Sequence, residues 1–230
     1  MWAIVPVKTF VYAKQRLRRV LDSDERAALS RVMLEDVLSV LSCSNRFVGV
    51  AVVTGDIGAV KLSRKLGARV ISDPNDCGQS SAVSNAVATL IKEDIETVAV
   101  IPGDVPLVTS AEIDLLHESH NEAPSLTVAP AHNCDGTNAL LCSPPTVIQF
   151  KFGENSLSKH ISLAKAVGIV PNIVRCEGLG LDIDTPSDLM ALIAAPTRSR
   201  AQSYLHDKGI ALRVRSYSKT ITSMKLAESS

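Results

Sequence analysis

Two acidic motifs of the sequence could hold a divalent cation. The first is PGDVP at residues 102–106, whose Asp104 follows an apolar run at residues 97–101 that is typical of a strand. Glycine and proline fix the turn around this carboxylate, so Asp104 would project from the end of the strand. A single carboxylate at that place can hold Mg²⁺ on a triphosphate. The alternative is a tight turn in which Asp104 only caps the backbone.

The second acidic motif is LDIDTP at residues 181–186. If residues 179–183 form a strand, Asp182 and Asp184 point to the same side, because side chains alternate along a strand. Two like charges side by side are costly unless a cation joins them, which favours metal binding by at least one of the two. The alternative is that Asp184 helps to begin the next helix, although Asp188 is better placed for that role.

A cationic segment follows the first apolar run of the chain. Its basic side chains are Lys8, Lys14, Arg16, Arg18 and Arg19. Ammonium and guanidinium groups bind phosphate oxygens, so this segment could receive the phosphates of a nucleotide. A solvated basic loop is the alternative, and charge alone does not decide between the two.

Two turns further along the chain could bind anions. Thr137 follows Gly136, and Gly153 precedes Ser156 at the start of a predicted helix. Glycine lets backbone N–H groups approach an anion closely, and the N-terminus of a helix attracts one. A phosphate and a carboxylate would suit these two places, although ordinary turns are the simpler interpretation.

The elements that must position these residues alternate between strands and helices. Apolar and β-branched runs predict strands at residues 2–7, 48–54, 69–72, 97–101, 126–131, 138–142, 172–175 and 179–183. Helical periodicity and capping residues predict helices at 22–41, 56–66, 79–92, 110–119, 156–167 and 186–194. This alternation predicts an α/β fold with a doubly wound, mostly parallel sheet, which binds ligands at the carboxyl ends of its strands.

Composition limits the classes of function. Hydrophobic residues make up 46% of the 230 residues and aromatics only 3%, so the core must be aliphatic. The 24 basic residues equal the 24 acidic ones, which argues against a nucleic-acid or acidic-membrane partner. No window approaches the roughly 18 apolar residues that span a membrane. Five scattered cysteines without a CxxC pair indicate a reducing, cytoplasmic compartment.

The predicted elements also suggest how the chain is divided. Residues 1–195 would form one domain. Residues 196–230 are polar and weakly patterned, and we expect a loosely attached C-terminal tail with one strand at 211–215.

Taken in order, these motifs resemble a known family, the 2-phospho-L-lactate guanylyltransferases (CofC/FbiD) of coenzyme F-420 biosynthesis. The resemblance covers residues 1 to about 195. The stretches that carry it are IVPVK at 4–8, AKQRL at 13–17, Arg26, MLED at 33–36, PGDVP at 102–106, GTN at 136–138, FKFG at 150–153 with Ser156, and LDIDTP at 181–186. One departure is GQSSA at 78–82, where the family often has Gly-Leu-Asn-Ala-Ala.

The resemblance implies a nucleotidyltransferase (nucleotide-diphospho-sugar transferase-like) fold. It also implies transfer of GMP from GTP to 2-phospho-L-lactate, phosphoenolpyruvate or 3-phospho-D-glycerate, with release of pyrophosphate. The implied site residues are Asp104, Asp182 and Asp184 for Mg²⁺, and Thr137, Gly153 and Ser156 for the acid. From the charge of the cationic segment and the position of GQSSA, we expect Lys8, Lys14, Arg16 and Gly78 at the nucleotide, and Asp104, Lys14 and Arg16 in catalysis. A homodimer is compatible with the resemblance.

The chemistry of the residues agrees with this assignment. The phosphate of the acid is already anionic, so its attack on a phosphorus atom needs alignment and charge neutralisation rather than a general base. Two alternatives stay open. A nucleotidyltransferase for molybdenum-cofactor or sugar-nucleotide synthesis usually has a glycine-rich first loop, which PVKTF at 6–10 lacks. A catalytically inactive nucleotide-binding regulator should have lost the strand-end aspartates, which are all present.

Overall fold

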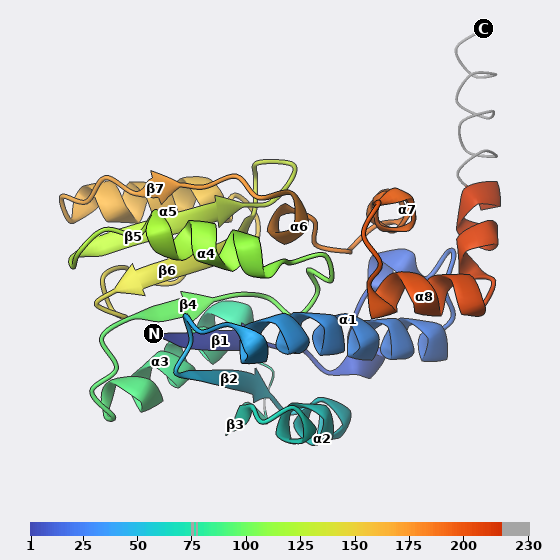
Figure 1. Cartoon of the computed structure of the whole chain (residues 1–230), viewed down its shortest axis with the longest axis horizontal. Coiled ribbons are helices and arrows are strands. Elements are labelled where there is room, and N and C mark those ends of the chain that lie inside the picture. The colour runs from blue at the N-terminus through green and yellow to red at the C-terminus, as the bar shows by residue number, and fades with distance from the viewer. Residues whose placement is uncertain (75, 77, 218–230) are drawn as a thin grey trace, which may run out of the picture.

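The computed structural model describes residues 1–74, 76 and 78–217. Within them a seven-stranded sheet runs through the middle of the molecule in the order β3-β2-β1-β4-β6-β5-β7 (Figure 1). Its strands are β1 (Trp2–Pro6), β2 (Gly49–Thr54), β3 (Arg69–Ser72), β4 (Val98–Val100), β5 (Ser125–Pro130), β6 (Thr137–Ser143) and β7 (Asn172–Ile173). β6 is antiparallel to β4 and β5, and the other pairs are parallel. The predicted α/β fold with a mostly parallel sheet is confirmed.

The strand order reverses at β1. The chain runs outward from β1 to β2 and β3 and then returns to place β4 on the other side of β1. Loops that leave neighbouring strands at such a point diverge, which opens a crevice at the carboxyl ends of the strands. The cationic segment follows β1 and Asp104 follows β4, so the fold brings both to this crevice.

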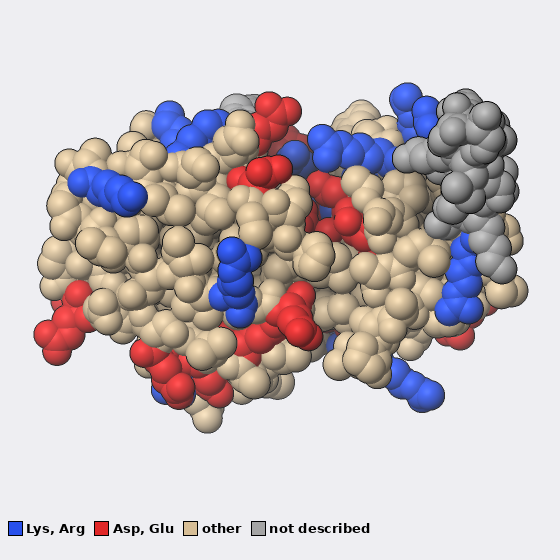
Figure 2. Space-filling view, turned by 90° about the horizontal axis from the view of Figure 1, so that it is seen from above, with Lys and Arg blue, Asp and Glu red and all other residues tan. Residues whose placement is uncertain are grey.

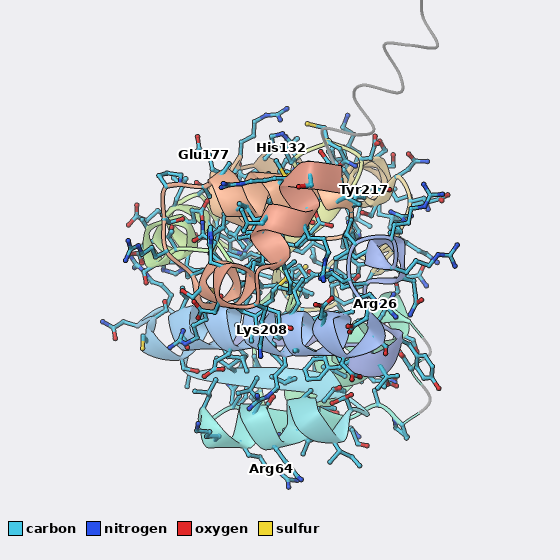
Figure 3. All side chains as sticks on the ribbon, turned by 90° about the vertical axis from the view of Figure 1, so that its right-hand side faces the viewer. Arg26, Arg64, His132, Glu177, Lys208 and Tyr217 are labelled. Atoms are coloured by element: carbon cyan, nitrogen blue, oxygen red, sulfur yellow. The ribbon has the colours of Figure 1, made fainter. Side chains whose placement is uncertain are left out.

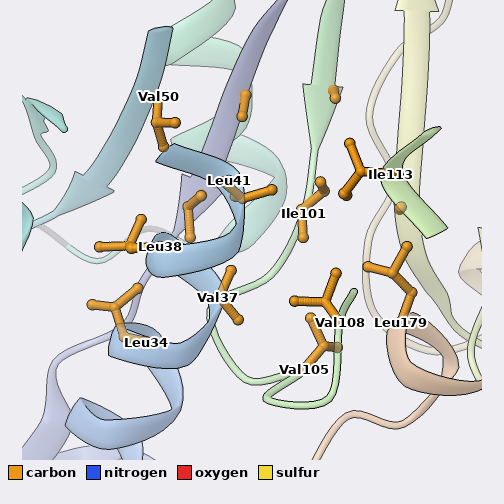
Figure 4. Close-up of a cluster of buried hydrophobic side chains, with 14 of the residues drawn as sticks. Leu34, Val37, Leu38, Leu41, Val50, Ile101, Val105, Val108, Ile113 and Leu179 are labelled. Atoms are coloured by element: carbon orange, nitrogen blue, oxygen red, sulfur yellow. The ribbon is translucent and has the colours of Figure 1, made fainter. Parts of the chain in front are cut away.

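Helices cover both faces of the sheet. On one face lie α1 (Ser23–Cys43), α2 (Ile57–Lys65) and α4 (Ser110–Glu118), and on the other lie α3 (Gln79–Ile91) and α5 (Ser156–Ala166). Figure 4 shows part of the first layer, where Leu34 and Leu38 of α1 share a buried cluster with Val50 of β2 and with Ile101. Aliphatic side chains dominate both layers, as the composition predicts.

Capping residues fix where several helices begin. Asp22 accepts a hydrogen bond from the Glu25 amide (2.8 Å), and the Glu25 carboxylate accepts one from the Asp22 amide (3.0 Å), so the predicted start of α1 is confirmed. Thr185 and Asp188 form the same reciprocal pair at α7 (Pro186–Ala194). α4 begins at Ser110, the first residue of the predicted range, and its cap is Thr109, which forms such a pair with the third helical residue, Glu112.

The prediction of a strand at residues 179–183 is wrong. The structure has a short helix, α6 (Glu177–Gly180), and an irregular segment after it. Gly178 packs so closely on the Leu107 carbonyl that an added Cβ would collide with it. The Asn138 side chain donates to the carbonyl oxygens of Leu179 (2.9 Å) and Gly180 (3.1 Å). These contacts satisfy backbone groups that a strand would have paired with the sheet.

The segment after residue 196 also differs from the prediction. It forms α8 (Arg200–Asp207), and residues 210–217 are helical as well, where we expected a strand at 211–215. Its buried residues Ala201, Leu205, Ile210 and Val214 recur at intervals of four or five, which suits one face of a helical segment better than alternation along a strand. The rest of the predicted tail, residues 218–230, lies outside the described residues.

These C-terminal helices pack firmly, so the expectation of a loosely attached tail is wrong for the described residues. Leu205 shares a buried cluster with Leu29 and Met33 of α1. The Asp36 carboxylate accepts hydrogen bonds from the backbone amides of Arg200 and Ala201, both at 2.9 Å, and thereby holds the start of α8. Figure 3 shows the segment that carries Lys208 and Tyr217 lying over α1.

None of the helices in the described part of the chain is both long and apolar enough to cross a membrane.

We expect the replacement Leu205→Ala to lower the free energy of unfolding by about 2–5 kcal/mol, because it leaves a cavity beside α1. Leu205 is fully buried, whereas Leu212 on the same segment is 69% exposed and provides the control Leu212→Ala. Urea denaturation of both variants measures the difference. Equal, small changes in the two would mean that the C-terminal helices do not contribute to the core.

Candidate functional site

A cleft of about 440 Å³ opens at the carboxyl ends of β1 and β4. The predicted site residues that line it are Lys8, Lys14, Arg16, Gly78, Asp104, Thr137, Asp182 and Asp184. They come from segments far apart in the sequence, and the crevice at the strand-order reversal brings them together. Figure 2 shows blue and red side chains interspersed on the upper face of the molecule, without a broad patch of one sign.

Lys14 lies at the centre of this cleft. Its ammonium nitrogen is 2.6 Å from Asp104 Oδ2 and 2.7 Å from Asp184 Oδ1, and only 6% of its side chain is exposed. Its backbone is left-handed, with φ 55° and ψ 38°, which costs a non-glycine residue roughly 1–2 kcal/mol. Strain of this kind often occurs at functional sites, and here it accompanies the Lys14 ammonium placed between two carboxylates.

The cationic segment is anchored to the fold. The Phe10 amide donates to Asp56 Oδ2 at 3.0 Å, and the same Asp56 caps the start of α2. The side chains of Phe10 and Leu17 are buried. Lys8 and Arg16 are exposed at the rim of the cleft. The backbone of the segment is thus held in place, while Lys8, Arg16, Arg18 and Arg19 are exposed to solvent, so phosphate binding by this segment stays a prediction.

The charges of the cleft shift one another's protonation. Burial on its own would lower the pKa of Lys14, but the charges of Asp104 and Asp184 outweigh it, and the pKa lies above its usual value. Burial would raise the pKa of Asp184, yet the charge of Lys14 holds that pKa below its usual value. Lys14 and Asp184 are thus a charged pair near neutral pH.

Asp182 behaves differently from Asp184. Burial first, and then the charge of Asp104, raise the pKa of the Asp182 carboxyl above its usual value. The Asn138 side chain donates to Asp182 Oδ1 at 3.1 Å and fixes its orientation. The amide of Ile183 donates to the Asp104 carbonyl at 3.1 Å, which ties the segment of Asp182 and Asp184 to the loop of Asp104.

The three aspartates do not form a ready-made coordination group. Among the described residues, no cluster of three or more His, Cys, Asp or Glu side chains is arranged to hold a metal ion. Two of the carboxylates instead share the Lys14 ammonium. Mg²⁺ commonly uses one or two carboxylates and completes its shell with water and substrate phosphates. The oxygen donors of Asp104 and Asp184, already arranged about a cation, fit such an ion.

The predicted anion-binding residues meet at the start of β6 and of α5. Thr137 opens β6, and Ser156 is the first residue of α5, as expected. Gly153 has φ +106°, a conformation that favours glycine. In the described structure, Gly153 and Ser156 do not line the cleft. The Leu157 amide, next to Ser156, donates to the Asp135 carbonyl at 3.1 Å and ties the start of α5 to the loop before β6.

His160 joins these two turns, and the sequence analysis missed it. Its Nδ1 lies 3.0 Å from the Thr137 hydroxyl, and the Lys151 amide donates to its Nε2 at 3.0 Å. Burial, with a contribution from the charge of Lys159, lowers its pKa to about 4. The signal was present: His160 follows Ser156 by four residues, which places both on one face of the helix.

Asn138 was also missed as a site residue, although it stands in the quoted motif GTN. Its buried amide group donates to two backbone carbonyls of α6 and to the Asp182 carboxylate. It therefore connects β6 with the acidic segment. No periodicity signals this role, because the contact depends on the irregular path of residues 181–184.

The chain is similar in sequence to a family of guanylyl transferases. The family model "Guanylyl transferase CofC like" matches residues 1–226, which includes the C-terminal helices. A phosphoenolpyruvate guanylyltransferase of Roseiflexus sp. is 37% identical over 218 residues, covering 91% of this chain and 94% of the relative. A 2-phospho-L-lactate guanylyltransferase of Methanothermobacter thermautotrophicus is 30% identical over 204 residues, covering 88% of each chain.

The fold is also found among solved structures. A protein of Desulfovibrio desulfuricans, provisionally described as a nucleotide-diphospho-sugar transferase, superposes with a TM-score of 0.73. The superposition covers 94% of this chain and 97% of the other, at 16% sequence identity. The predicted nucleotidyltransferase fold is thereby confirmed.

We expect His160 to make the stability of the protein depend on pH. The pKa of His160 lies near 4 in the folded protein against 6.5 ordinarily. The unfolded chain therefore binds the extra proton first as the pH falls, and stability is lost from about 6.5 down to about 4. The variant His160→Asn lacks this loss. Urea denaturation from pH 7 to 4.5 should show the two proteins converging in stability, and a constant difference would contradict the assignment.

Proposed function

This chain belongs to the family of CofC-like guanylyl transferases, and we propose that it transfers GMP from GTP to a three-carbon phospho-acid in coenzyme F-420 biosynthesis. The acceptors to consider are phosphoenolpyruvate, 2-phospho-L-lactate and 3-phospho-D-glycerate, since relatives are named for each of these acids. The observation that carries the proposal is the Lys14 ammonium held between Asp104 and Asp184 at the carboxyl ends of β1 and β4. Carboxylates that can hold Mg²⁺, with an ammonium group between them, suit a triphosphate that arrives with the ion.

The reaction needs alignment more than proton transfer. An oxygen of the acceptor phosphate attacks the α-phosphorus of GTP, a new phosphoanhydride bond forms, and the bond to the β-phosphate breaks to release pyrophosphate. The attacking oxygen is already anionic, so no side chain has to remove a proton from it. The protein has to overcome the repulsion between two anionic substrates and hold them in line.

Basic residues of the cleft would neutralise the triphosphate. Lys8 and Arg16 stand exposed at the rim and are free to turn toward a bound nucleotide. Lys14 is held by carboxylates, and it would exchange part of that contact for a phosphate oxygen when substrate arrives. Gly78, at the start of α3 with φ +90°, would let the backbone approach the nucleotide closely.

Mg²⁺ would be held by Asp104 and Asp184, with Asp182 beside them as a further oxygen donor. When bound, the ion would withdraw charge from the phosphate oxygens. The support lies in the donor set, which is oxygen only, and in the position of Asp182, whose pKa is raised by burial and by the neighbouring charge of Asp104. Before the ion binds, the Lys14 ammonium neutralises part of the negative charge of Asp104 and Asp184.

The phospho-acid would lie against Thr137, Gly153 and Ser156. Thr137 lines the cleft at the start of β6. The Phe152 amide, next to Gly153, donates to the Ser80 hydroxyl of α3 at 2.9 Å, so the Gly153 turn lies beside the start of α3. Ser156 at the N-terminus of α5 and the glycine backbone at Gly153 supply donors for an anion.

We also propose that the enzyme works in the cytoplasm and assembles as a homodimer. The free thiols of Cys43, Cys134, Cys142 and Cys176 support a reducing compartment. The dimer rests on the family resemblance.

The replacement Asp104→Asn tests the proposed function. It removes a charge from the cation site and keeps the shape, so we expect turnover with GTP and acid to fall by about 10²-fold or more. Asp114→Asn, which removes one of the two α4 carboxylates that pair with Arg46, is the matched control. Near-normal turnover in a folded Asp104→Asn protein would refute the site.

A second prediction concerns the nucleotide. Arg16→Ala should raise the KM for GTP more than the KM for the acid, because the guanidinium would contact only the triphosphate. Arg18 is also exposed but does not line the cleft, so Arg18→Ala serves as the control. The KM values for GTP and for the acid are measured by steady-state kinetics. Equal KM values for GTP in the two variants would show that Arg16 does not bind the nucleotide.

A third prediction concerns the acid. Ser156→Ala should raise the KM for the acid by roughly 10- to 150-fold, the equivalent of about 1.5–3 kcal/mol for a hydrogen bond to a charged group. The KM for GTP should stay within about twofold, a change of less than 0.5 kcal/mol. A parallel rise of both constants would instead indicate a general distortion of the fold at the start of α5.

A further inference from the structure

His160 lies beneath the corner of the cleft where the acid would bind. It is on α5, its side chain is fully buried, and both of its ring nitrogens are engaged. The Phe152 ring meets it edge-on, with 5.1 Å between centroids and 71° between planes. The imidazole is thus fixed in position and in rotation.

The contacts also fix which ring nitrogen carries the proton. The Lys151 amide can only donate, so Nε2 of His160 must accept and must be unprotonated. In the neutral ring the proton then lies on Nδ1, which donates to the hydroxyl oxygen of Thr137 at 3.0 Å. The lowered pKa of His160 agrees with a neutral ring throughout the physiological range.

This tautomer decides what the Thr137 hydroxyl can do. An oxygen that already accepts a hydrogen bond from Nδ1 directs its own hydrogen elsewhere. Thr137 lines the cleft, and its hydroxyl would otherwise be free to rotate. A hydroxyl held in this way presents a donor, which is what an anionic ligand requires.

We propose that His160 is a positioning residue that orients the Thr137 hydroxyl as a hydrogen-bond donor to the anionic acceptor. This inference rests on the proposed function, because it takes the phospho-acid as the anion. His160 acts through Thr137 and does not itself touch the substrate.

Two substitutions separate the orienting contact from mere packing. Asn places its amide near the position of Nδ1, so His160→Asn keeps a donor for Thr137 and leaves the Lys151 amide unpaired. Gln places its amide near the position of Nε2, so His160→Gln keeps an acceptor for Lys151 and loses the contact with Thr137. Both variants lose the imidazole and should be destabilised to a similar extent.

We expect the two variants to differ in the KM for the acid. His160→Gln should raise the KM for the acid by about 10-fold, the lower end of the range for a hydrogen bond to a charged ligand. His160→Asn should raise it by less than about threefold, since its donor is retained. The KM for GTP should be unchanged in both. A purely structural role would move both variants equally.

A double variant tests whether His160 acts through the hydroxyl. If it does, Thr137→Val with His160→Gln should have the same KM for the acid as Thr137→Val alone, because the interacting group is already missing. His120 provides the control: it also bonds two hydroxyls, those of Thr127 and Ser143, but at the opposite end of β6. His120→Gln should leave the KM for the acid unaltered.

The outcomes distinguish this inference from the function on which it rests. If the wild-type protein turns over GTP with none of the three acids, the proposed function fails and the inference fails with it. If the wild type is active and His160→Gln has a normal KM for the acid, the inference alone is overturned. Additive effects of His160→Gln and Thr137→Val would overturn it as well.

Discussion

The cleft is organised by the need to keep three carboxylates together at one edge of a sheet. Asp104 and Asp184 share the Lys14 ammonium at 2.6 and 2.7 Å, and Asp182 stands beside them with a raised pKa. Without a cation, this concentration of negative charge would oppose folding. The left-handed backbone at Lys14 is a local cost of supplying that charge from the protein itself, and the anchoring of the cationic segment through Phe10 helps to hold Lys14 in place.

The direction of β6 explains how one cleft can serve two anionic substrates. β6 is antiparallel to β4, so its first residue, Thr137, lies at the edge where the parallel strands end. A parallel strand would have placed Thr137 at the far edge, about 20 Å away for a strand of this length. Asn138 and His160 then extend the site outward, the first toward Asp182 and the second toward the Gly153 turn. The residues proposed for the acid and those proposed for the nucleotide thus lie at the same edge of the sheet.

The sequence predicts the features that depend on neighbouring residues. β-branched runs predict β2, and reciprocal capping pairs predict the start of α1 and α7, because these signals are local. Features that depend on distant contacts escape it. Residues 179–183 have the sequence pattern of a strand, but the Asn138 side chain donates to the carbonyl groups of Leu179 and Gly180 instead. The C-terminal helices are weakly patterned in the sequence, and their buried face is evident only from the packing of Leu205 against α1. The role of His160 depends on Thr137 and Lys151, and its spacing of four residues from Ser156 is the local sign that the sequence offers.

The most direct measurement is a reaction of the purified protein with GTP, Mg²⁺ and each of the three phospho-acids in turn. Pyrophosphate release and the mass of the product are followed together. The account predicts release of one pyrophosphate for each molecule of a guanosine-diphospho acid formed, with at least one of the acids and only when that acid is present. GTP bound without turnover by any of them would contradict the account and would point to a nucleotide-binding regulator instead.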